Sequence, residues 1–85
     1  MPLYLIERTF AEQLEVDAES QAEVAQVNEE LGLERLFSFL SADKRKTYCL
    51  YQAPNPELIR EAAQRLGIPA DEIIEVSELR PEQFA

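Results

Sequence analysis

The chain has 85 residues, 46% of them hydrophobic and 29% charged, and a formal net charge of −9 at pH 7. This length predicts a single domain over residues 1–85 with a modest core, because so short a domain buries only about 60–65% of the surface that its unfolded chain exposes. The negative charge disfavours nucleic acid and anionic lipid as partners, and no apolar run approaches the ~20 residues of a membrane helix. The N-terminus has no basic residues ahead of its short apolar run, so we expect no secretory signal and a cytoplasmic location.

The N-terminal third predicts a strand followed by a helix. Residues Leu3 to Phe10 alternate as a strand does, which places Glu7 and Arg8 on opposite faces. After a connection over residues 11–16, Asp17 is well placed to cap a helix that ends at Gly32. Its apolar stripe is narrow and rich in alanine: Val24, Val27 and Leu31, with Ala18, Ala22 and Ala25 beside them. Such a helix covers one side of a sheet without burying much of its own far side.

The middle of the chain, about Glu34 to Ala53, predicts a β-hairpin in which two apolar runs flank a charged loop. If Ser41 pairs with Lys46, the side chains divide between two faces. One face carries Phe37, Phe39, Tyr48 and Leu50, and the other carries Leu36, Ser38, Leu40, Thr47, Cys49 and Tyr51. Both faces are largely apolar, so we expect helices to cover one and a second subunit to cover the other in a homodimer.

The C-terminal part predicts a second helix and a last strand. Pro54 breaks the preceding strand, Asn55 can cap the helix, and Gly67 ends it. Its buried stripe consists of Ile59, Ala62, Ala63 and Leu66. A turn at residues 70–71 leads into a strand from Glu72 to Leu79, and residues 80–85 form a tail.

The order strand, helix, strand, strand, helix, strand predicts an α+β fold. Two right-handed crossovers joined by a hairpin give the ferredoxin-like βαββαβ sandwich. We expect a four-stranded antiparallel sheet in the order 4-1-3-2, with two helices on one face.

The residue types limit the chemistry. The chain has no His, which excludes Ser/His/Asp and Cys/His catalysis, and its two glycines lie at predicted helix ends rather than in a phosphate-binding loop. A single Cys49 forms no intramolecular disulfide and is expected to be a small core residue. The polar side chains predicted on or near the central strands are the candidate ligand-binding residues: Glu7, Arg8, Tyr48, Tyr51 and Glu75.

Two functions are compatible with this set. The first is a non-enzymatic dimeric binding module for a metal ion or a small ligand. The second is a small cofactor-free enzyme of the dimeric α+β barrel type, in which Glu7 or Glu75 and a tyrosine act as acid and base. No pair of catalytic residues has a diagnostic spacing, which favours the binding module.

Several segments also resemble a known family: residues 3–10 (LYLIERTF), 41–51 (SADKRKTYCLY), 53–57 (APNPE) and 73–76 (IIEV). They resemble small bacterial proteins of unassigned function, whose best-known type is a nickel-binding, nickel-responsive protein. The resemblance covers nearly the whole chain and implies a ferredoxin-like fold, a homodimer formed through the sheets, and nickel binding. Because nickel favours imidazole nitrogen and the chain has no His, the candidate metal ligands are Glu7, Glu75, Cys49 and the tail carboxylate.

Overall fold

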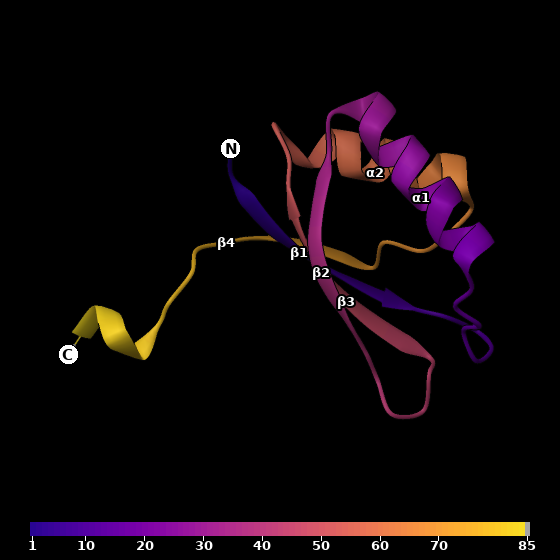
Figure 1. Ribbon diagram of the computed structural model, residues 1–85, viewed down its shortest axis with the longest axis horizontal. Coiled ribbons are helices and arrows are strands. Elements are labelled where there is room, and N and C mark those ends of the chain that lie inside the picture. Colours follow the sequence, from indigo (N-terminus) through magenta and orange to yellow (C-terminus); the bar gives the residue numbers. More distant parts are fainter. Residues whose placement is uncertain (85) are drawn as a thin grey trace.

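The computed structural model describes residues 1–84 and has the predicted order of elements (Figure 1). These are β1 (Leu3–Thr9), α1 (Ala18–Leu31), β2 (Glu34–Leu40), β3 (Lys46–Gln52), α2 (Pro56–Leu66), β4 (Glu72–Val76) and a one-turn 3-10 helix η1 (Pro81–Phe84). The antiparallel sheet has the order β2-β3-β1-β4, which is the predicted order read from its other edge. The ferredoxin-like α+β fold is confirmed. Within the described residues, no helix is long and apolar enough to cross a membrane.

Both helices begin and end where the sequence predicts, because local side chains satisfy their terminal backbone groups. The Asp17 carboxylate accepts a hydrogen bond from the backbone N–H of Ser20 at 2.7 Å, and the Ser20 side chain completes a capping box. Asn55 accepts one from the N–H three residues later at 3.1 Å. Gly32 and Gly67 end the helices with φ of 70° and 65°, the left-handed region that side chains disfavour.

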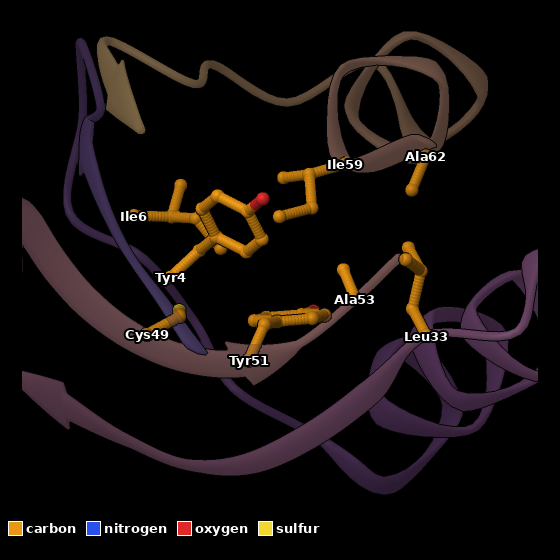
Figure 2. Close-up of a cluster of buried hydrophobic side chains, with 8 residues drawn as sticks. All are labelled: Tyr4, Ile6, Leu33, Cys49, Tyr51, Ala53, Ile59 and Ala62. Carbon is orange, nitrogen blue, oxygen red and sulfur yellow. The ribbon is translucent and has the colours of Figure 1, made fainter. Parts of the chain in front are cut away.

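The core lies between the sheet and α2. Tyr4 and Ile6 of β1 face Ile59 of α2, and both isoleucines are almost completely buried (Figure 2). The second helix therefore anchors the sheet centre, as its predicted stripe requires.

Helix α1 contributes less to this core. Val27 and Leu31 pack against it only partly, and the buried side chain of α1 is the polar Asn28. The expected alanine flank is not buried, since Ala22 and Ala25 are exposed. Helix α1 contacts both α2 and β2, and its alanines lie on the side turned away from these neighbours.

The hairpin has the predicted register from Phe37 to its loop. The Ser41 N–H donates to the carbonyl of Lys46 at 2.9 Å, and Phe39 lies opposite Tyr48. Before Phe37 a bulge shifts the register by one residue, so Arg35 rather than the predicted Leu36 lies opposite Tyr51. The helical cover, however, does not extend to β2, which is exposed along its whole length. Even Leu40, which lies opposite buried Thr47 on the helix side, is 43% exposed.

The last strand ends at Val76 rather than at the predicted Leu79. Val76 lies opposite Leu3, the first residue of β1, and the preceding Pro2 has no N–H to continue the ladder. Residues 77–84, here called the C-terminal arm, instead run away from the body to the lower left of Figure 1. They lie on the far side of the sheet from α1 and α2.

Candidate functional site

An open groove of about 400 Å³, here called the α1 groove, lies between α1, the loop before it, and the helix-side face of the hairpin. Buried Thr47, Cys49 and Tyr51 of β3 form its floor. Its wall is mainly apolar and includes Val24 of α1 and Leu14 of the preceding loop. The groove remains open because α1 has few large apolar side chains with which to fill the space above β2 and β3.

Arg8 is the unusual residue of this groove. It comes from β1, opposite Thr47, and is only 4% exposed. One guanidinium nitrogen donates to the carbonyl of Pro69 at 2.7 Å, and no ion pair within residues 1–84 includes Arg8. A guanidinium carries five N–H donors and a full charge, and a buried charge ordinarily has a charged partner. The α1 groove therefore contains a largely buried arginine whose guanidinium has no carboxylate partner within residues 1–84.

Several other polar groups of the groove have partners within the protein, whereas the exposed Glu15 carboxylate and the Ser38 hydroxyl at its wall have none among residues 1–84. Arg35, exposed at its side, donates to the Gln21 side chain at 2.7 Å. The Tyr51 hydroxyl accepts a hydrogen bond from the Asn28 amide at 3.0 Å, and the Cys49 thiol lies 3.9 Å from the Thr47 hydroxyl. With no His beside the thiol, the groove holds no nucleophile and base pair.

The five residues predicted to bind a ligand do not form one site. Arg8 and Tyr51 line the α1 groove. Glu7 and Tyr48 are cross-strand neighbours on the opposite face of the sheet. Glu75 is exposed on the edge strand β4.

The Glu7 and Tyr48 pair lies beside Lys46. The Lys46 ammonium is 5.2 Å from the centre of the Tyr48 ring, and the pKa of Lys46 is raised, first by the Tyr48 side chain and to a lesser extent by the negative charge of Glu7. Glu7 and Tyr48 thus form part of a charged margin on an otherwise apolar face rather than an enclosed acid and base.

The candidate metal ligands are also separated. Glu7 and Cys49 lie on opposite faces of the sheet, with Cys49 buried beneath the helices. Glu75 lies near neither Glu7 nor Cys49. Across residues 1–84, no three His, Cys, Asp or Glu side chains gather in a group able to hold a metal ion. The described side chains do not fit a nickel site.

The sheet face away from the helices, here called the open face, is the second notable surface. It exposes large apolar side chains from the two edge strands, Phe37 (51%) and Phe39 (64%) of β2 and Ile74 (43%) of β4, with partly buried Leu5 and Leu50 of the central strands between them. The two phenylalanines pack edge to face with ring centres 5.5 Å apart. This face is the apolar surface that the hairpin pattern predicts.

The groove itself was not predicted. Its floor residues Thr47 and Cys49 lie on the same face of β3 as Tyr51, and the sequence predicted helices to cover one face of the hairpin. The narrow stripe of α1 was the available signal, since a helix with so few large apolar residues has little to fill the space above β2 and β3.

Comparison with known proteins places these features in a family. The family described as "Nickel responsive protein SCO4226-like" matches residues 4–76. The crystal structure of SCO4226 from Streptomyces coelicolor A3(2) superposes with a TM-score of 0.78 at 19% identity, covering 92% of this chain and 99% of that chain. No curated protein matches. Because the family match spans most of the sequence, the chain belongs to the SCO4226-like family.

Proposed function

We propose that this member of the SCO4226-like family is a non-enzymatic binding module for a small, largely apolar molecule with one anionic group, held in the α1 groove. The observation that carries the proposal is the buried Arg8 guanidinium without a carboxylate. A carboxylate or similar group would accept two parallel hydrogen bonds from it and neutralise its charge.

The size and lining of the groove define the rest of the ligand. Small-molecule sites typically measure about 300–1,000 Å³ and are mainly apolar with a few polar groups. The α1 groove is at the small end, at about 400 Å³. A ligand the size of a two-ring aromatic acid would place its apolar body along Val24 and Leu14 and its anionic group at Arg8.

The net charge of −9 does not oppose this assignment. Exposed charges are screened beyond a Debye length of about 8 Å at physiological ionic strength, whereas a contact with a buried guanidinium is screened much less. Affinity should therefore depend on Arg8 itself rather than on the overall field of the protein.

The two alternative functions have weaker support. An acid and base enzyme would need Glu7 or Glu75 in an enclosed site, and the α1 groove is lined by neither. The family is described as nickel responsive, but the described residues of this chain offer no cluster for nickel and the chain has no His.

The partner that we propose is a second copy of this chain on the open face. Its support is the set of exposed apolar side chains on β2 and β4 with partly buried Leu5 and Leu50 between them, a surface that monomeric proteins seldom leave in contact with water.

The ligand proposal is tested with a matched pair of probes, 2-naphthoate and the uncharged 2-naphthamide, titrated into ¹⁵N-labelled protein and followed by NMR. We expect naphthoate to shift the amide signals of Thr47, Cys49 and Val24, and to bind at least tenfold more tightly than naphthamide. Arg8→Met should abolish that difference. The control Arg60→Met, at a solvent-exposed arginine of α2, should retain it.

Equal affinity for the two probes would contradict an anion site at Arg8. Shifts confined to open-face residues such as Leu5 and Leu50 would move the site away from the α1 groove. Absence of binding by both probes at millimolar concentration would contradict the proposed ligand class.

A further inference from the structure

We infer that the C-terminal arm of one chain packs on a second copy of the same chain, so that two arms are exchanged in the dimer. This inference rests on the proposed pairing through the open face and adds the element that completes it.

The arm is ordered within itself but projects from the body. The Gln83 N–H donates to the carbonyl of Arg80 at 3.1 Å, and the Arg80 guanidinium binds Glu78 and lies 3.7 Å from Glu82. Within residues 1–84, every hydrogen bond and ion pair of the arm beyond β4 is internal to it. Because its turn is already formed, docking it elsewhere would cost less conformational entropy than ordering a flexible tail.

The arm presents two large apolar side chains to solvent. Leu79 is 76% exposed and Phe84 is 73% exposed, the highest values among the large hydrophobic residues of the chain. The extended arm also enlarges the molecule: the radius of gyration is 13.4 Å, against about 12 Å expected for a compact domain of this length. Apolar side chains as exposed as these are expected to pack against another protein surface.

The position of the arm identifies that surface. It leaves β4, an edge of the open face, and runs on the side of the sheet away from α1 and α2 (Figure 1). A second chain docked on the open face would therefore lie within its reach. Its own helices, which lie on the other side of the sheet, would not.

The area of the open face supports the same conclusion. Four strands about 4.8 Å apart, with five to seven residues at about 3.3 Å each, make a rectangle of roughly 20 by 20 Å, or about 400 Å² in plan. A specific protein interface buries about 800 Å² per partner. The sheet face is therefore a small interface by itself, and two exchanged arms would enlarge the buried area.

The test compares full-length chains by sedimentation equilibrium. The double variant Leu79→Ser with Phe84→Ser should raise the dimer dissociation constant at least tenfold. The matched double variant Leu79→Met with Phe84→Met keeps the apolar area and should change it less than threefold. In a sample mixed from ¹³C-labelled and unlabelled chains, isotope-filtered NOEs should connect the Phe84 ring to the other chain.

The outcomes separate this inference from the dimer on which it rests. A dimer with an unchanged dissociation constant in the serine variant would refute arm exchange and leave face-to-face pairing intact. NOEs from Phe84 to its own sheet alone would refute it as well. A wild-type chain that is monomeric at about 100 μM, a usual concentration for NMR, would refute both arm exchange and face-to-face pairing, since no partner would be present for the arm.

Discussion

Replacing Arg8 with methionine should stabilise the protein. Removing a charged side chain from water costs several kcal/mol even after the surroundings relax. Here Arg8 is 4% exposed, and within residues 1–84 its guanidinium donates one hydrogen bond, to the Pro69 carbonyl at 2.7 Å. A hydrogen bond from a charged group offsets about 1.5–3 kcal/mol of that cost. Methionine has a similar length, fills irregular space readily and needs no desolvation of charge. After allowing about 1 kcal/mol for the carbonyl left to water, we expect a net gain of about 1–2 kcal/mol in the free energy of unfolding.

Urea unfolding followed by circular dichroism measures this gain directly. For a domain of this size, each kcal/mol shifts the melting temperature by about 4–8 °C, so a rise of at least about 4 °C should accompany it. The control Arg60→Met, at an exposed arginine whose ion pair spans 3.7 Å, should stay within about 0.5 kcal/mol of the natural chain. A loss of more than about 1 kcal/mol in Arg8→Met would refute the reasoning, because it would make the guanidinium a structural clamp on the Pro69 turn rather than a receptor for an anion.

Four further outcomes are expected. Asn55→Ala should lower the free energy of unfolding by about 1 kcal/mol in urea titrations, because α2 loses its N-terminal cap. Lys44→Gly should raise it by roughly 0.5–1 kcal/mol in the same assay, because Lys44 has a φ of 61° that glycine adopts without strain. The pKa of Asp17 is lowered, chiefly by the hydrogen bond from the Ser20 backbone, so its stabilising effect is present above its ordinary pKa of about 3.9 and is lost as pH falls through the lower folded value. Melting curves at decreasing pH should therefore show a smaller acid loss in Asp17→Asn than in the natural chain. Finally, calorimetric titration of metal-free protein with nickel should give a dissociation constant no tighter than about 1 μM, because the chain lacks His and residues 1–84 hold no ligand cluster.

The fold follows from local signals that the sequence carries openly. Asp17 and Asn55 begin the helices, the two glycines end them, and the Ser41 to Lys46 pairing sets the hairpin register. Each is a short-range interaction whose partner lies within five residues, so a single sequence contains the information needed to predict it.

The candidate site depends on long-range placement, and for that reason it was only partly predicted. Arg8 and Tyr51 were singled out, but their grouping with Val24 depends on where α1 sits above the sheet. That position is set by packing against α2 and by the buried Asn28, whose amide bonds the Tyr51 hydroxyl. A polar residue in a helix gives no periodic signal of its burial, so residue patterns alone did not separate the groove from the open face.

The β-bulge in β2 bears on how copies of this chain could associate. An exposed edge strand with apolar side chains on both faces is a template on which further copies could add without limit. Between Arg35 and Phe37 the pairing with β3 shifts by one residue, so the backbone groups along β2 lose their regular spacing. A second chain therefore meets an interrupted ladder at the edge and a continuous apolar surface on the face. Growth along the edge leads to fibres, whereas pairing of two like faces closes after a single step. One additional residue in a strand thus favours a finite assembly over aggregation.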